Sequence, residues 1–448
     1  MTLTLSDVPV RCFQGVIPCG IATADARGIP NITYISQVHR VDDRHVALSC
    51  QFFNKTRRNL DENPHARVEL LDPLTFQAYR LHMRFVRSEK SGELFDAMAM
   101  RIQAIASHTG MSGVFKLIAA DICEVVHIEK VEGFLVERND EPEECVSVAG
   151  LRSEIRGLQL VSERINRAED LESLLTLVLQ SLDEYFGFEH TMVLLCDDVK
   201  LVTIASRGYG QSGVGAEVAA GAGLIGTVAR EKRMLRISGL NEKLRYGRAI
   251  RREAGADTPE IPLPGLPDAQ STLIIPLLIG DRLVGVLSAE DRDPFRFGEW
   301  DEAYLGVIAN QIALGIDRML DDEPEEVPVI AAPVAPQPAS APASRTLTYY
   351  KNDDCVFVDG EYLVRNVPGR ILWKLLNERE REGRTEFTNR ELRLDASLGL
   401  PPIKDNLESR LILLRKRLSE KCPDVRIVPT ARGRFALQVD GAVELVEK

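Results

Sequence analysis

The sequence lacks the patterns that define disulfide-rich, zinc-binding and membrane-spanning proteins. Its eight cysteines include no Cys-x-x-Cys pair, and they stand at positions 12, 19, 50, 123, 145, 196, 355 and 422. Neither a disulfide framework nor a zinc site is therefore indicated. No run approaches the roughly 18 consecutive apolar residues of a membrane span, and the first residues lack the apolar stretch of a signal peptide. We expect a cytoplasmic protein with reduced thiols and no membrane association.

Histidine is also sparse, with seven residues in the chain. Five of them are scattered without helical or Cys-x-x-His spacing, at positions 39, 45, 82, 108 and 127. Metal and haem ligands usually show a recognisable spacing. No metal site is therefore assigned from the sequence.

Positive charge is in the minority, because the formal net charge is −12. Such a balance ordinarily argues against nucleic-acid binding. The deficit is uneven, however. Residues 345–448 hold 20 Lys and Arg against 17 Asp and Glu, whereas the preceding 344 residues hold 35 against 50. A mildly basic unit binds DNA when its cations gather on one face, so the C-terminal region stays a candidate.

Length and composition predict three folded units. A chain of 448 residues at about 150 per domain suggests about three domains. Residues 321–344 are rich in proline and alanine and are predicted to be an extended linker, and the acidic stretch 137–144 marks a weaker boundary. We expect units at 1–136, 150–320 and 345–448 in an α+β multidomain chain.

The first unit alternates short strand-like runs with turns, which predicts a small β-barrel. Runs at 20–24, 31–35 and 45–50 are separated by turn candidates at 25–28 and 42–43. The stretch from Asn54 to Pro64 then predicts a short helix capped by Asn54. Lys55, Thr56 and Arg57 would present donors at its positive end, where a phosphate is stabilised.

This Asn-Lys-Thr-x-x-Asn-Leu-x-x-Asn-Pro pattern resembles the FMN-binding split barrel of the pyridoxamine 5'-phosphate oxidase-like superfamily, over about residues 8–130. The resemblance implies that Lys55 and Thr56 hold the FMN phosphate with support from Arg57 and Asn59. It also implies that Ser49, Cys50 and Gln51 lie along the ring. Haem, another cofactor and an empty barrel stay open as alternatives. The arginines that bind the substrate phosphate in true oxidases have no obvious match here, so enzymatic activity is left undecided.

The second unit opens with a helix whose residues Leu151, Ile155, Leu158, Ser162 and Ile165 follow a four-three spacing. Such a stripe predicts pairing with a second copy. The blocks that follow resemble a GAF domain over about residues 150–320, an α/β sandwich. They are a helix at 169–186, strands at 191–196, 271–277 and 282–290, a Gly-x-Gly turn at 221–229 and a last helix at 299–320. The resemblance implies a small-molecule ligand, and Arg245, Tyr246 and Arg248 could meet an anion or only cover the sheet.

The third unit carries a basic helix followed by a basic hairpin. Leu407, Leu411, Leu414 and Leu418 form an apolar stripe, and the charged residues off that stripe predict a basic outer face. Pro423 ends this helix. Strands at 425–428 and 435–439 then enclose a turn with two arginines.

This pattern, from Arg345 to about Val439, resembles an OmpR-type winged helix-turn-helix domain. The resemblance implies that the helix enters the major groove of double-stranded DNA with Asn406, Ser409, Arg410 and Leu413 facing base edges. Arg415, Arg417, Arg432 and Arg434 would contact phosphates or the minor groove. A charged surface helix beside a solvated hairpin is the alternative.

Together these features predict a dimeric sensor-type transcriptional regulator with two sensory units and a DNA-binding output. A flavin-dependent oxidoreductase with regulatory GAF and C-terminal domains is the first alternative. A scaffold whose C-terminal unit binds protein or RNA polymerase is the second. The sequence does not identify the inducer, the operator or the direction of regulation.

Overall fold

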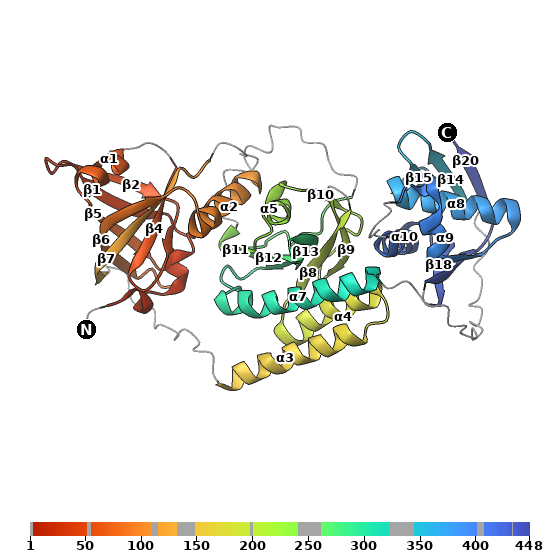
Figure 1. Cartoon of the computed structure of the whole chain (residues 1–448), viewed down its shortest axis with the longest axis horizontal. Helices are drawn as coiled ribbons and strands as arrows, with labels where there is room; N and C mark the ends of the chain where they lie inside the picture. Colours follow the sequence, from red (N-terminus) through yellow and green to blue (C-terminus); the bar gives the residue numbers. More distant parts are fainter. Residues whose placement is uncertain are drawn as a thin grey trace.

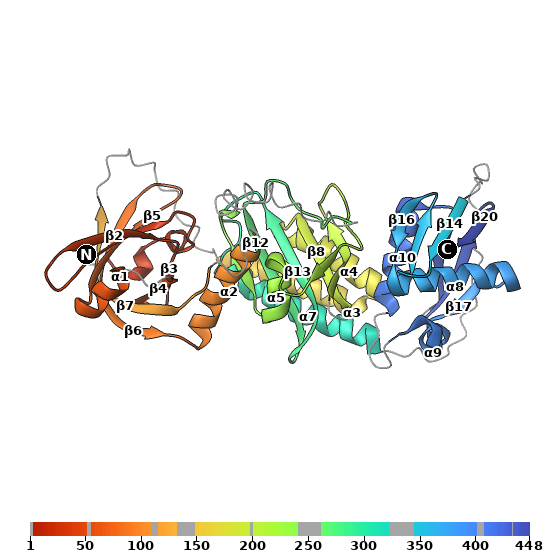
Figure 2. The same cartoon turned by 90° about the horizontal axis from the view of Figure 1, so that it is seen from above.

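Three folded units follow one another along the long axis of the computed structural model (Figures 1 and 2). The structure describes residues 3–51, 55–108, 115–131, 148–197, 200–240, 261–321, 345–400, 407–431 and 433–448. The predicted acidic boundary at 137–144 and nearly all of the predicted linker, from residue 322 to 344, lie outside these ranges. No helix among the described residues is both long and apolar enough to cross a membrane.

The first unit is a curved seven-stranded antiparallel sheet in the order β2-β1-β5-β6-β7-β4-β3. Its strands are β1 Cys19–Ala24, β2 Pro30–Ile35, β3 Val38–Arg40, β4 His45–Cys50, β5 His65–Leu71, β6 Ala78–Glu89 and β7 Ala119–Val131. Buried and exposed side chains alternate along the strands, and the buried ones fill the inside of the barrel. Along β5, Val68 and Leu70 are buried while Arg67 and Glu69 face outward. The predicted strands are confirmed.

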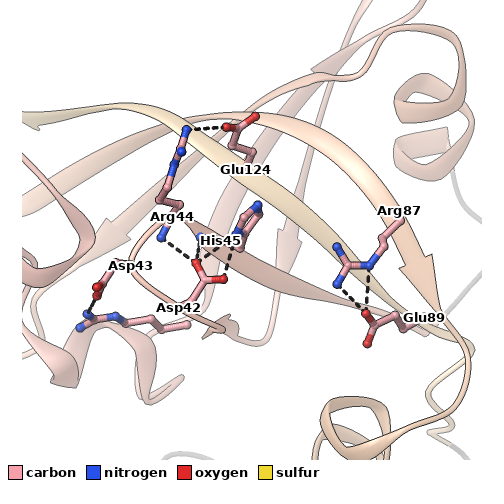
Figure 3. A network of polar contacts seen from close by, with 8 residues as sticks. Asp42, Asp43, Arg44, His45, Arg87, Glu89 and Glu124 are labelled. Atoms are coloured by element: carbon pink, nitrogen blue, oxygen red, sulfur yellow. Dashed lines mark hydrogen bonds and ion pairs between the residues drawn. The ribbon is translucent and has the colours of Figure 1, made fainter.

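Two short 3-10 helices, η1 Leu5–Asp7 and η2 Val10–Phe13, precede the barrel, and two α-helices interrupt it: α1 Lys55–Glu62 and α2 Glu93–His108. The predicted turn at Asp42 joins β3 to β4. The carboxylate of Asp42 accepts hydrogen bonds from the backbone N–H groups of Arg44 and His45, as Figure 3 shows. The Arg44 side chain meets Glu124 on β7 at 2.9 Å. This network fixes the β3–β4 turn against the neighbouring strand.

Helix α2 was not expected from the sequence, and it connects the barrel to the second unit. It lies between the two units in both views (Figures 1 and 2). Met100 and Ala104 are buried in a core cluster that also contains Leu224 and Val228 of the second unit. The barrel and the second unit therefore share apolar surface.

The second unit is a six-stranded antiparallel sheet in the order β10-β9-β8-β13-β12-β11, with helices on both faces. Its strands are β8 His190–Asp197, β9 Lys200–Arg207, β10 Glu217–Ala219, β11 Leu235–Ile237, β12 Ser271–Ile279 and β13 Arg282–Asp291. Its helices are α3 Val148–Arg167, α4 Leu171–Phe186, α5 Gly223–Glu231 and α7 Glu299–Asp321. The helices α3, α4 and α7 cover one face and α5 lies on the other (Figure 1).

Local signals explain where two of these helices begin. Asp170 caps α4, because its carboxylate accepts a hydrogen bond from the Ser173 N–H at 2.7 Å. The stretch expected to be a Gly-x-Gly turn is instead the start of α5. A Cβ atom at Gly226 would lie 2.3 Å from the carbonyl oxygen of Ala219, so only glycine allows this close approach.

The third unit combines two small sheets with three helices. A four-stranded sheet has the order β16-β15-β14-β20, and a three-stranded sheet has the order β17-β19-β18. The strands are β14 Arg345–Tyr350, β15 Cys355–Val358, β16 Glu361–Val364, β17 Glu386–Thr388, β18 Val425–Ala431, β19 Arg434–Val439 and β20 Val443–Glu447. The helices are α8 Asn366–Glu382, α9 Asn389–Leu394 and α10 Leu407–Lys421, with a 3-10 helix η3 Ala396–Leu398. The first and last strands pair in parallel and close the unit around its own apolar core.

Candidate functional site

The beginning of α1 is the candidate phosphate site in the barrel. Lys55 is exposed, and its ammonium group lies 3.4 Å from the carbonyl oxygen of Pro30. Thr56 is buried, and its hydroxyl accepts a hydrogen bond from the Asn31 side-chain amide at 3.0 Å. Asn54, the predicted cap, lies outside the described residues. Among the described cations of this motif, Lys55 and Arg58 are thus the ones that face solvent.

Arg57 belongs to an ion-pair network inside the barrel. Its guanidinium group donates to Asp121 at 2.6 Å, to Asp61 at 2.7 Å and to Ser88 at 2.6 Å. Burial raises the pKa of Asp121, although Ser88 and Arg57 act in the opposite direction. The structure therefore gives Arg57 carboxylate partners that the sequence motif does not reveal.

The remaining residues of the predicted cofactor set lie in two different surroundings. Asn59 is buried and donates to the Thr23 hydroxyl at 3.1 Å, which ties α1 to β1. Ser49 and Gln51, at the end of β4, line a cavity of about 330 Å³ between the barrel and α2. Cys50 between them is half-buried, and burial raises the pKa of its thiol. The helix α1 residues do not line this cavity.

Arg101 of α2 is a cavity residue that the sequence analysis missed. Its guanidinium group donates to the carbonyl oxygens of Arg236 at 2.8 Å and Gln14 at 3.0 Å. Burial, followed by the neighbouring charge of Arg236, lowers its pKa to about 10. The helical periodicity of residues 93–108 was the available signal, but it does not indicate which strand the helix faces.

The cavity has polar groups in its wall that could meet part of a polar ligand. The Ser49 hydroxyl is buried and has no hydrogen-bond partner among the described residues, and Ser36 and Gln37 add polar groups to the wall. A buried hydroxyl without a partner is costly, so a ligand that supplies one is favoured. The ring system of FMN meets this requirement. Lys55 and Arg58 are the exposed cations of α1, while Arg57 is already held by carboxylates.

Two histidines expected to be unrelated lie side by side on the barrel. His82 and His127 are cross-strand partners on β6 and β7, with ring centroids 5.5 Å apart. The Nε2 atom of His82 lies 3.0 Å from Glu129. Within the described ranges, no group of three or more His, Cys, Asp and Glu side chains is arranged to hold a metal ion. The pair depends on strand register, which residue spacing does not show.

The predicted ligand residues of the second unit, Arg245, Tyr246 and Arg248, lie outside the described residues. The structure brings together three other polar side chains at one end of the sheet. Glu290 on β13 is opposite His190 on β8, and its carboxylate accepts a hydrogen bond from the Leu266 N–H at 2.8 Å. Tyr209 lies against His190 with ring centroids 5.8 Å apart. Burial raises the pKa of both Glu290 and Tyr209.

Helix α10 differs from the expectation of a basic face open to solvent. That expectation is wrong for this arrangement of the units, because Ser409, Arg410 and Arg417 are all buried. Arg417 contacts its own unit, where it donates to the Leu363 carbonyl oxygen at 3.1 Å and meets Glu420 at 3.0 Å. Asn406 lies outside the described residues.

The second unit contacts three further α10 residues that were expected to meet DNA, Arg410, Leu413 and Arg415. Arg410 pairs with Asp197 at 2.6 Å, and Arg415 lies 3.3 Å from Glu172. The partly buried Leu413 packs against the core cluster that contains α3, α4 and α7. In Figure 2, α10 lies on the side of its unit that faces the second unit.

The hairpin β18–β19 stays open on one side. Arg434 is exposed at the start of β19, while Arg432 lies outside the described residues. Arg434 and Arg415 also line a cavity of about 700 Å³ between the second and third units, together with Glu169 and Glu408. This cavity carries charges of both signs.

Two segments of the chain match family models. Residues 10–126 match the model described as pyridoxamine 5'-phosphate oxidase, and residues 170–316 match the model of the GAF domain. No curated protein matches the chain.

Several solved structures resemble single units. A GAF domain from an Acinetobacter phosphoenolpyruvate-protein phosphotransferase is 20% identical, with a TM-score of 0.32, over 37% of this chain and 93% of that chain. The corresponding GAF domain from Coxiella burnetii is 24% identical, with a TM-score of 0.32, over 37% of this chain and 94% of that chain. HupZ from Group A Streptococcus is 21% identical, with a TM-score of 0.23, over 29% of this chain and all of that chain. On the strength of the two family models, this chain combines a pyridoxamine 5'-phosphate oxidase-like split-barrel domain with a GAF domain.

Proposed function

We propose that this protein is a sensor-type transcriptional regulator that binds double-stranded DNA through residues 345–448. The observation that carries the proposal is the basic helix α10, which is followed directly by the hairpin β18–β19 with Arg434 exposed at its turn. Helices of this kind dock in the major groove while neighbouring elements contact the phosphates.

The order of elements supports this proposal. A small sheet precedes three helices, and a hairpin follows the third helix. This is the order expected for an OmpR-type winged helix. The charge of residues 345–448 supports it too, because the acidic surplus of the chain lies outside them.

The barrel and the GAF domain supply the sensing role in this proposal. The barrel would bind FMN, with Ser49 and Gln51 beside the ring and Lys55 on the phosphate. The GAF domain would bind a small-molecule effector. Either ligand would act by shifting the populations of conformations in which the C-terminal unit is available or covered.

We also propose a homodimer that forms through the long helices of the GAF domain. On α7, Trp300, Val307 and Leu314 recur every seven residues and are 45%, 47% and 62% exposed. Ile155 on the adjacent helix α3 is 57% exposed. A seven-residue apolar repeat is the pattern by which helices pair, and a second copy of the chain offers the same surface.

The salt dependence of DNA binding tests the proposed function. Arg434→Ala should weaken binding of the full chain to every duplex sequence and reduce the slope of log K against log salt by about one. Lys351→Ala serves as the control, because Lys351 is exposed on the β14–β15 turn and pairs with Glu447. Equal slopes for Arg434→Ala and wild type would show that the hairpin does not contact phosphates.

A flavin-dependent oxidoreductase is the second candidate function. It is favoured by the family-model match of residues 10–126 and by the cavity at Ser49. In such an enzyme the flavin would supply the hydride chemistry and the protein would supply orientation. The visible spectrum of the purified protein separates a flavin, a haem and an empty barrel. Substrate-dependent bleaching of a flavin spectrum, without DNA binding, would favour the enzyme.

A further inference from the structure

The DNA-reading face proposed for α10 is the face that the GAF domain covers. Arg410 pairs with Asp197 at the end of β8, and the ammonium group of Lys416 donates to the carbonyl oxygen of Ile204 on β9 at 3.0 Å. The Ser212 hydroxyl donates to Glu420 at 2.6 Å. These contacts lie along one side of the GAF sheet, on β8, on β9 and on the loop that joins β9 to the outermost strand β10, and we call this surface the GAF edge.

Apolar contacts accompany the polar ones. Ile412 is 1% exposed and belongs to the GAF core cluster, against which Leu413 also packs. A Cβ atom at Gly215 would lie 2.9 Å from a methyl carbon of Leu413, so the GAF backbone approaches α10 closely at this point. The interface therefore combines apolar contacts of Ile412 and Leu413 with charged contacts around them.

Three GAF carboxylates hold cations of the C-terminal unit. Asp197 meets Arg410, Glu172 meets Arg415, and Glu217 meets Arg365 at 2.7 Å. Carboxylates and DNA phosphates both offer anionic oxygens to guanidinium groups. The GAF carboxylates thus pair with Arg410 and Arg415, which would otherwise be available to base edges and phosphates.

The contact between the GAF domain and α10 leaves several buried hydrogen-bond donors without an acceptor. Among the described residues, the Nε and Nη1 atoms of Arg410 and the Nε atom of Arg415 are buried without a hydrogen-bond partner. Burial also lowers the pKa of Lys416. Buried donors without partners cost free energy, so the closed arrangement is less favourable than its apolar contacts alone would make it. A closed state of this kind is suited to opening.

We infer that the GAF domain inhibits DNA binding by holding α10 against β8 and β9, so that DNA and the GAF edge compete for Arg410, Leu413 and Arg415. This inference rests on the proposed DNA-binding function. An effector that loosens the GAF edge would release the helix, and DNA would in turn stabilise the released state.

A substitution on the GAF side tests the competition without altering the DNA-binding surface. Asp197→Asn leaves Arg410 buried without its counter-ion, which favours opening. The full chain with this change should bind random-sequence duplex DNA at low salt roughly tenfold more tightly than wild type, or more. Asp183→Asn is a matched control. Its carboxylate also pairs with an arginine, Arg207, at 2.6 Å and is equally exposed at 31%, but the pair lies within the GAF domain.

A reversible cross-link provides the second measurement. Ser212→Cys and Glu420→Cys place thiols at two exposed positions that touch in the closed arrangement. A reducible bifunctional thiosulfonate should join them and abolish DNA binding, and reduction should restore it. Single-cysteine variants control for the native thiols, and the cross-linking yield reports how far the contact is closed.

The outcomes separate this inference from the function on which it rests. Tighter binding by Asp197→Asn, together with a lower cross-linking yield in its background, supports inhibition. Equal DNA binding by wild type, Asp197→Asn and the cross-linked chain overturns the inhibition and leaves DNA binding intact. A lower cross-linking yield without binding to any duplex overturns both.

Discussion

Lys55 and Arg57 are two positions apart in one motif, but the fold gives them different surroundings. Lys55 reaches solvent, whereas Arg57 is held by Asp61 and by Asp121, which is 64 positions away. The sequence identified the cations, because a helix start that follows a strand is a recognisable phosphate site. It could not identify Asp121 as a partner, since that contact depends on how β7 folds back beside α1. The sequence therefore predicted the candidate site residues but not the residues that they contact.

The proposed flavin site predicts the effect of removing the Lys55 charge. Lys55→Ala removes a charge-assisted contact worth about 1.5–3 kcal/mol, so the affinity for FMN should fall roughly 10- to 150-fold. Lys90→Ala, at an exposed position after β6, should leave the affinity unchanged. Fluorescence quenching of added FMN measures both. If wild type binds no FMN, the flavin assignment fails.

Asp395 gives a prediction about pH. Its carboxylate accepts hydrogen bonds from Lys374 at 2.6 Å and from the Ser397 N–H at 2.8 Å, and these lower its pKa from 3.8 to about 2. A lowered pKa stabilises the fold above about pH 4, and this contribution is lost as the pH falls through 2. Asp395→Asn should therefore lower the free energy of unfolding by about 2 kcal/mol at pH 7 and by about half as much at pH 3.

Urea unfolding of a fragment of residues 345–448 measures this difference, because the fragment has its own apolar core and Trp373 as its single tryptophan. The asparagine keeps the shape of the side chain, so the comparison isolates the charge. A loss of stability that is the same at both pH values would assign the effect to packing instead.

At the scale of elements, periodicity predicted the strands well and helix surroundings poorly. The runs at 45–50, 271–277 and 282–290 correspond to β4, β12 and β13. The leucine stripe of α10 faces its own core as expected. Periodicity showed that Arg410 lies off this stripe, but it could not show that a second unit covers it. Helix α2 was missed for the same reason. Its buried residues face two units at once, so they do not form a single apolar stripe.

The exposed stripe on α7 predicts the oligomeric state. Leu314→Glu places a charge within the proposed helix pair and should convert the dimer to a monomer without unfolding the GAF domain, because Leu314 is 62% exposed. Ala220→Glu, at an exposed position on the turn after β10 and outside α7, is the control. Leu158 is a poorer choice than its place in the sequence stripe suggested, since it packs against the GAF core. Light scattering measures the mass of each variant in solution. A wild-type mass of one chain, 49.8 kDa, would contradict the dimer.

At the scale of the whole molecule, the GAF domain lies between the cofactor candidate and the DNA-binding candidate (Figures 1 and 2). It meets the barrel through α2 and meets the C-terminal unit through the GAF edge, which includes residues of β8 and β9. A change in either sensory unit can therefore reach α10 through packed elements. The domain order was readable from sequence motifs, whereas these contacts were not, because they join residues more than one hundred positions apart.

DNA binding by residues 345–448 is tested by fluorescence anisotropy of one labelled duplex with the full chain and with the fragment of residues 345–448. The measurement is repeated over a range of salt concentrations. We predict that the fragment binds at low salt, that its affinity falls as salt increases, and that it binds more tightly than the full chain, in which α10 is covered. A folded fragment that binds no duplex DNA at low salt, whether random or drawn from its own genome, would contradict the proposed DNA-binding function and favour the flavin enzyme.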